Sequence, residues 1–124
     1  MENPDIDVLA HPGFLTLEEA RLAKENGVLI EITGRMGHNI TNGHVVGVAR
    51  EAGAAMVIDS DAHAPENLMD EAAARTVALG AGMTEAEADL ALNVTPFEAI
   101  RRIRHRREAI WKNPRPPSGC CSRR

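Results

Sequence analysis

Three short apolar segments, separated by about 20 residues, most constrain what this chain can fold into. They cover residues 5–10, 28–33 and 54–59. Each is short enough for a strand, and the second is almost continuously apolar, which is typical of a strand covered on both faces. The sequence therefore predicts three strands that are far apart along the chain.

The segments between these strands have helical signals. A capping box formed by Thr16 and Glu19 opens a helix predicted over residues 17–26, and a second helix is predicted over residues 44–52, with Thr41 or Asn42 as its cap. Crossovers of this length join parallel strands through right-handed connections. We therefore expect the α/β fold class.

Only helices are predicted after the third strand. Their expected ranges are 70–80, 85–92 and 96–111. Thr84 and Thr95 each begin a capping box. We assign residues 1–112 to one domain, and we expect residues 113–124, which are rich in Pro and Arg, to form a disordered tail.

The composition indicates a globular protein outside the membrane. No apolar run approaches the roughly 20 residues of a membrane span, and Met1–Asp5 is too polar to begin a secretory signal. The adjacent Cys120 and Cys121 are interpreted as free thiols because no distant cysteine exists to pair with them. We expect a cytoplasmic protein.

Charge is distributed unevenly along the chain. Residues 1–100 hold 5 Lys/Arg and 17 Asp/Glu, a balance of -12, whereas residues 101–124 hold 9 and 1, a balance of +8; together they give -4. An acidic body disfavours a nucleic-acid partner. The basic end is interpreted as a solvated helix and tail, with phosphate or RNA contact as the alternative.

Imidazoles and carboxylates lie late in or directly after all three predicted strands. They are His11, Glu31, Asp59, Asp61 and His63. The carboxyl ends of parallel strands meet at one edge of the sheet, where ligands bind in α/β folds. Mixed nitrogen and oxygen ligands suit Zn, Mn or Fe. Taken singly, His11 could bond a loop carbonyl and Asp61 could cap a turn, but together they favour a metal site.

Three of these segments resemble the last motifs of the polymerase-and-histidinol-phosphatase (PHP) superfamily. They are Ala10-His11-Pro12-Gly13, the strand with Glu31-Ile32-Thr33, and Ser60-Asp61-Ala62-His63. The resemblance covers residues 5–100 and is closest to the histidinol-phosphatase-like members. It implies a partial (β/α) TIM-like barrel, namely the C-terminal part of the distorted seven-stranded barrel of that superfamily.

The resemblance also implies a chemistry. It makes His11, Asp61 and His63 metal ligands, with Asp61 and His63 as the catalytic pair, in a metal-dependent phosphoesterase that takes a small phosphorylated substrate. The cofactor it implies is a divalent metal, Zn, Mn or Fe. Such metals activate water and neutralise charge on the phosphoryl group.

The chain departs from the superfamily pattern at its beginning. The His-x-His and Gly-x-Glu elements that open the superfamily pattern are absent. We therefore expect a truncated chain with impaired hydrolysis. The alternative is a catalytically inactive PHP-like fragment that acts as a binding or scaffold module. An open sheet edge would favour a homo-oligomer.

The polar loop over residues 34–44 is the second candidate for substrate contact. Arg35 can bind a phosphate in a bidentate manner, and His38 can donate a proton. The resemblance places substrate contacts in this loop, so Arg35 and His38 are predicted to bind the substrate. An ordinary surface loop that leads into a helix cap is the equal alternative.

Overall fold

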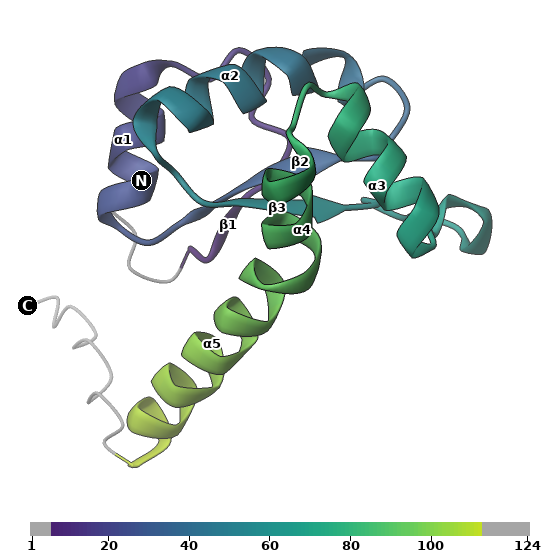
Figure 1. Cartoon of the computed structure of the whole chain (residues 1–124). Helices are drawn as coiled ribbons and strands as arrows, with labels where there is room; N and C mark the ends of the chain where they lie inside the picture. The colour runs from purple at the N-terminus through teal and green to yellow at the C-terminus, as the bar shows by residue number, and fades with distance from the viewer. Residues whose placement is uncertain (1–5, 113–124) are drawn as a thin grey trace, which may run out of the picture.

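The structure is a computed structural model that describes residues 6–112. The predictions for Met1–Asp5, for the tail over residues 113–124 and for its two cysteines lie outside these residues. The described chain is mostly helical, and its helices and strands follow one another in the order β1, α1, β2, η1, α2, β3, η2, α3, α4, α5 (Figure 1).

The strands form one small parallel sheet. They are β1 (Val8–Leu9), β2 (Leu29–Thr33) and β3 (Met56–Asp59). Their order in the sheet is β1-β2-β3, and every pairing is parallel. Val8 lies opposite Leu29, and Thr33 lies opposite Asp59. The predicted α/β class and the parallel strands are thus confirmed.

The expected partial TIM-like barrel of the PHP type is wrong. The described residues form a three-stranded open sheet that does not close into a barrel. After β3 the chain continues through η2 (Pro65–Asn67), α3 (Glu71–Gly80) and two further helices, with no later strand among the described residues. A barrel needs strands that continue the hydrogen-bonded ladder until it closes, so this is a small α/β domain.

Two helices connect the strands. The capping box of Thr16 and Glu19 opens α1 (Leu17–Glu25), as predicted. After η1 (Asn39–Thr41), α2 (Asn42–Ala52) begins without a hydrogen bond from a capping side chain, so the predicted cap by Thr41 or Asn42 is wrong.

Three helices follow the sheet. Asp70 caps α3, and the predicted capping box of Thr84 opens α4 (Glu85–Asn93). The capping box predicted at Thr95 is wrong, since Thr95 is itself the first residue of α5 (Thr95–Lys112). Only one residue separates the two helices, and the Glu98 amide donates to the backbone carbonyl of Val94. The Glu98 amide, which a capping side chain of Thr95 would have bound, is therefore bound by a backbone carbonyl instead.

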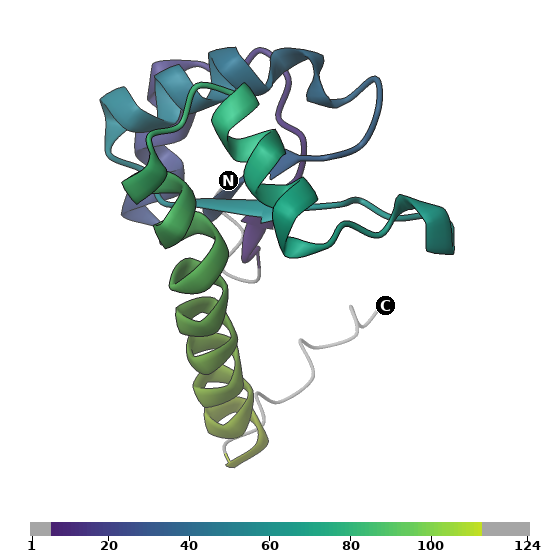
Figure 2. The same cartoon turned by 45° about the vertical axis from the view of Figure 1, so that its right-hand side comes forward.

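The core lies between the sheet and the helices that cover it. Ile30 and Ile32 of β2 are fully buried, together with Val45 and Val46 of α2. Buried alanines on α1, α2, α3 and α4 complete the cluster, and their small side chains allow close packing of helix on sheet. In both views α5 extends away from the sheet (Figures 1 and 2).

None of the helices within residues 6–112 is both long and apolar enough to cross a membrane. The longest, α5, carries five arginines.

A bidentate ion pair fastens α2 to α4. Arg50 Nε and Nη2 each lie within 2.8 Å of a Glu87 carboxylate oxygen, and Nη2 also donates to the Gly82 carbonyl. The hydrogen bond from Arg50, then the bond from the Thr84 backbone, lower the pKa of Glu87 to about 2. The ionised carboxylate thus stabilises the fold above its unfolded pKa.

We predict that Glu87→Gln lowers the free energy of unfolding at pH 7 by about 1–2 kcal/mol, after allowance for solvent screening. Because the folded pKa is depressed, this stabilisation is complete above about pH 4.5 and is lost as the pH falls towards 2. Urea unfolding at pH 7 and pH 2.5 measures it. Glu85→Gln, at a neighbouring and more exposed carboxylate, is the control; equal losses in both variants would contradict the prediction.

The sheet has two outer edges, at β1 and β3, with no strand paired to them among residues 6–112. Unpaired edges favour association with another chain. We predict that the protein self-associates, so static light scattering at increasing concentration should report a mass above the 13.4 kDa of one chain. A constant monomer mass would contradict this.

Candidate metal centre

The parallel sheet gathers polar side chains at the carboxyl ends of its strands. His11 follows β1, Asp59 ends β3, and Asp61 follows Asp59 after one residue. The loop after β2 leads to His38, which directly precedes η1. Three separate segments thus deliver side chains to the same edge.

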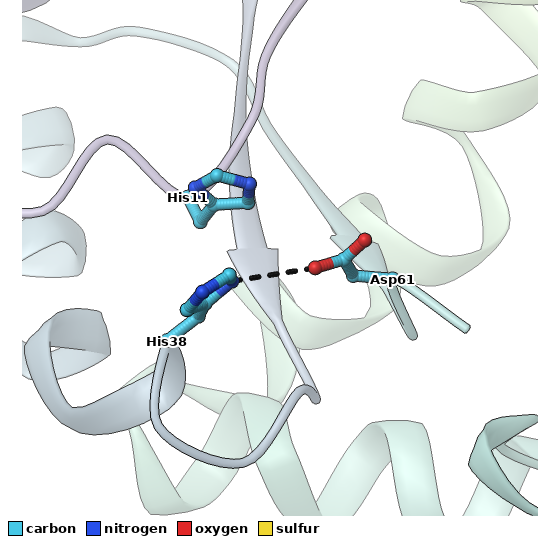
Figure 3. A group of neighbouring side chains, drawn as sticks. All are labelled: His11, His38 and Asp61. Carbon is cyan, nitrogen blue, oxygen red and sulfur yellow. Dashed lines mark ion pairs between the residues drawn. The ribbon is translucent and has the colours of Figure 1, made fainter. Parts of the chain in front are cut away.

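Two imidazoles and one carboxylate converge there. One ligand atom from each of His11, His38 and Asp61 lies within 4.8 Å of the other two. His38 Nδ1 is 3.3 Å from Asp61 Oδ2, and the rings of His11 and His38 have centroids 4.3 Å apart. Figure 3 shows the two rings on one side of the cluster and the carboxylate facing them.

The donor set fits a divalent metal ion. Two imidazole nitrogens and a carboxylate oxygen are ligands that Zn, Mn and Fe accept. Ligand atoms around one tetrahedral zinc lie about 3.4 Å apart, because each sits about 2.0–2.1 Å from the metal. The His38–Asp61 separation already has this value, and the ligand atom of His11 lies within 4.8 Å of the other two. Three protein ligands leave a position open for water or substrate.

His63 and Arg35 contact the same carboxylate from other directions. His63 Nε2 lies 3.3 Å from Asp61 Oδ1, and Arg35 Nε lies 3.6 Å from Asp61 Oδ2. Arg35 Nη1 also donates to the Asp61 backbone carbonyl at 2.9 Å. Because it binds both the side chain and the backbone of Asp61, Arg35 is held at the edge of the cluster.

The positions of the predicted residues differ in one respect from the roles that the sequence suggested. His11 and Asp61 lie together, but the third member of the compact group is His38, which was predicted to contact substrate. His63 is beside Asp61 but outside the three-residue group, with 65% of its side chain exposed. Its assignment as a ligand, and the substrate roles of Arg35 and His38, stay predictions.

The surroundings of Asp61 favour its ionised form. Partial burial raises the pKa of its carboxyl, but the hydrogen bond from His63, the charge of Arg35 and the hydrogen bond from His38 outweigh it. The net pKa therefore lies below the ordinary aspartate value. An ionised carboxylate is the form that binds a metal ion.

Both His11 and Asp61 have unusual backbone conformations. They are the only residues other than glycine with positive φ in the described chain, 29° for His11 and 45° for Asp61. Positive φ costs His11 about 1–3 kcal/mol, and such strain collects at functional sites. The His11 amide donates to Glu31 Oε2 at 2.6 Å, and the Asp61 amide donates to Asp59 Oδ1 at 2.7 Å.

Asn42 closes the base of the loop that carries Arg35 and His38. Its side chain is buried, donates from Nδ2 to the Thr33 carbonyl at 2.8 Å, and accepts from the Thr33 amide through Oδ1 at 3.4 Å. It thus binds the last residue of β2 as a neighbouring strand would. The sequence pattern did not indicate this role, because an asparagine before a helix also reads as a cap.

An open pocket of about 500 Å³ adjoins the centre. Arg35 and Ser60 line it on the side of the cluster, and Met36, Leu68 and Met69 provide apolar surface. The pocket leaves room beside Arg35 for a group attached to an anion bound there.

We predict that Asn42→Ala lowers the free energy of unfolding by about 1–3 kcal/mol, because the buried amide and carbonyl of Thr33 lose their partners. Urea unfolding monitored by circular dichroism gives the value. Asn39→Ala, at an exposed asparagine of the same loop, should change stability by less than about 0.5 kcal/mol. A loss at Asn42 no larger than at Asn39 would refute the role of Asn42.

The chain is similar to a protein of the archaeon Methanocaldococcus jannaschii that is described as an uncharacterized protein. The two are 50% identical over 99 residues, which is 80% of this chain and 45% of the archaeal protein. The chain thus spans less than half the length of that relative. No protein-family model matches the chain, and no solved structure matches it.

Proposed function

We propose that His11, His38 and Asp61 hold a divalent metal ion, Zn, Mn or Fe, in a site that hydrolyses phosphate esters. The observation that carries this proposal is the convergence of their three ligand atoms within 4.8 Å from three separate strand ends. The ring contact between His11 and His38 and the 3.3 Å approach of His38 Nδ1 to Asp61 Oδ2 support it.

The chain's own residues suit a phosphate ester at this site. When bound, the metal would supply an activated water and neutralise charge on the phosphoryl group. Arg35 lies beside the cluster, and its planar guanidinium can pair with two phosphoryl oxygens. His63, exposed on the other oxygen of Asp61, is placed to donate a proton to the leaving group. The substrate would be a small phosphorylated molecule.

The resemblance to the PHP superfamily supports the same reaction class with a different distribution of roles. It assigns Asp61 and His63 as the final ligand pair and gives His38 to the substrate. The geometry favours His38 as a ligand, because its Nδ1 is as close to Asp61 as the His63 ring is and it also lies next to His11. A site with more than one ion would use all four residues.

Further ligands from a longer polypeptide would complete such a site. Three protein ligands suffice for one catalytic zinc ion but are few for a multinuclear cluster. The archaeal relative is more than twice as long as the matched region. We propose that the present chain alone binds one ion and hydrolyses phosphate esters slowly.

A non-catalytic binding or scaffold module is the second candidate. It is favoured by one observation, that three protein side chains surround the Asp61 carboxylate, namely Arg35, His38 and His63. In this case the cluster would be a network of ion pairs that fixes the strand-end loops.

The acidic charge of residues 1–100 disfavours a nucleic-acid partner. The cytoplasmic location stays a prediction.

Metal binding separates the two functions. We predict one Zn²⁺ or Mn²⁺ per chain by calorimetry, and at least about 100-fold weaker binding for His38→Ala, because the loss of a ligand exceeds the roughly 10- to 100-fold loss caused by removing a ligand's supporting partner. His105→Ala, on α5, is the matched control. Absence of stoichiometric binding to the wild-type chain would favour the scaffold module.

Hydrolysis of p-nitrophenyl phosphate tests the assignment of His63. If His63 donates the proton, His63→Ala should lower the rate by roughly 100-fold or more while metal affinity stays within about threefold. A parallel loss of metal affinity would instead make His63 a ligand, as the resemblance implies. A rate that His63→Ala leaves unchanged would exclude both roles.

A further inference from the structure

We propose that Glu31 is a positioning residue, whose carboxylate holds the backbone of His11 in the conformation that directs its imidazole toward His38 and Asp61. Its effect on metal affinity rests on the proposed metal site, but the conformational claim does not. Glu31 touches neither imidazole in this role, so it would act through the His11 backbone.

Glu31 is a carboxylate in a place where carboxylates are costly. It is the third residue of β2, lies opposite Val57 of β3, and is only 4% exposed. A buried carboxylate must be hydrogen-bonded to be tolerated. Its Oε2 accepts the amide proton of His11, which is 20 residues earlier in the chain, at 2.6 Å. This short, charge-assisted hydrogen bond offsets part of the free energy that is lost when the carboxylate is buried.

The residue that donates its amide to Glu31 is also one with a strained backbone. His11 has a φ of 29°, a conformation that residues with side chains rarely adopt. The bond from its amide to Glu31 fixes the orientation of the peptide group that enters His11. Without that bond, we expect His11 to relax to a negative φ, which would swing its ring away from His38.

Asp61 has the same arrangement in a local form. Its amide donates to Asp59 Oδ1 two residues away, and its φ is also positive. Both non-glycine residues with positive φ in the described chain are thus candidate ligands, and both donate their amide to a carboxylate that belongs to a strand. The Asp61–Asp59 bond closes a local turn, whereas the Glu31–His11 bond joins residues 20 apart in the chain. Replacement of Glu31 therefore tests a tertiary contact without changing the turn that carries Asp61.

Two other roles for Glu31 are less consistent with the geometry. Its carboxylate is not part of the group of ligand atoms that lie within 4.8 Å of one another, so it is not placed as a ligand. The contacts of Arg35 go to the side chain and backbone of Asp61, and no ion pair is found between Glu31 and Arg35 within residues 6–112.

Cobalt titration of the full chain tests the effect on the metal site. Glu31→Gln keeps a carbonyl oxygen that can accept the His11 amide, and Glu31→Leu removes the acceptor at similar size. We expect Co²⁺ affinity and its visible absorption band to stay within about threefold of wild type in Glu31→Gln. In Glu31→Leu the affinity should fall about 10- to 100-fold, the range for loss of a ligand's supporting partner.

Hydrogen exchange of the His11 amide, followed by NMR without metal, tests the conformational claim by itself. Glu31→Leu should speed exchange of this amide at least about tenfold, while core amides such as that of Ile32 keep their protection. Glu31→Gln should restore slow exchange. If Glu31→Leu fails to fold, Glu31→Asp, with a carboxylate withdrawn by one methylene, takes its place and should show the same direction of change.

Each result supports or overturns the role. Wild-type cobalt affinity in Glu31→Leu, or unchanged exchange at His11, would overturn it. Equal weakening by Gln and Leu would overturn it as well, because charge and not the acceptor would then matter. If the wild-type chain binds no cobalt, the proposed metal site fails, and the exchange of the His11 amide alone decides whether Glu31 positions this residue.

Discussion

The parallel pairing of β2 with β3, which places Thr33 opposite Asp59, determines the geometry of the candidate metal centre. This register brings the end of β2 and the end of β3 to the same level of the sheet. The loop to His38 therefore starts beside the turn to Asp61, and the shorter β1 adds His11 from the other side of β2. A shift of β3 by one residue would turn Asp59 to the opposite face and would separate the amide of Asp61 from its acceptor.

The centre depends on carboxylates in two different functions. Asp61 presents its side chain to two imidazoles and a guanidinium, whereas Glu31 and Asp59 accept backbone amides. The accepted amides belong to His11 and Asp61, so these hydrogen bonds offset part of the cost of the positive φ of both residues. Asn42 adds a third support, because it binds the backbone of Thr33 and thereby holds the base of the intervening loop. Of these three supports, Glu31 and Asn42 are buried, whereas Asp59 is exposed.

Features with local causes were predictable from the sequence, and features that depend on the path of the whole chain were not. The capping box of Thr16 needs only residues three apart, so its pattern identified α1 correctly. The same pattern failed at Thr95, because α4 ends at Asn93, two residues earlier, and Val94 supplies the carbonyl that accepts the Glu98 amide. The barrel was inferred from resemblance and not from any periodicity. The place of His38 depends on how Asn42 folds the loop back, which no local pattern encodes.

The position of Arg35 decides how the centre would use a cation. Its guanidinium already lies beside Asp61, and a metal ion on the same carboxylate would be repelled by it. A phosphate dianion bound between the two would remove this repulsion, because it offers oxygens to the metal and to the guanidinium together. The site therefore suits a metal ion and an anionic ester bound jointly better than a metal ion alone. In phosphoryl transfer both positive charges would stabilise the charge that develops on the phosphoryl oxygens.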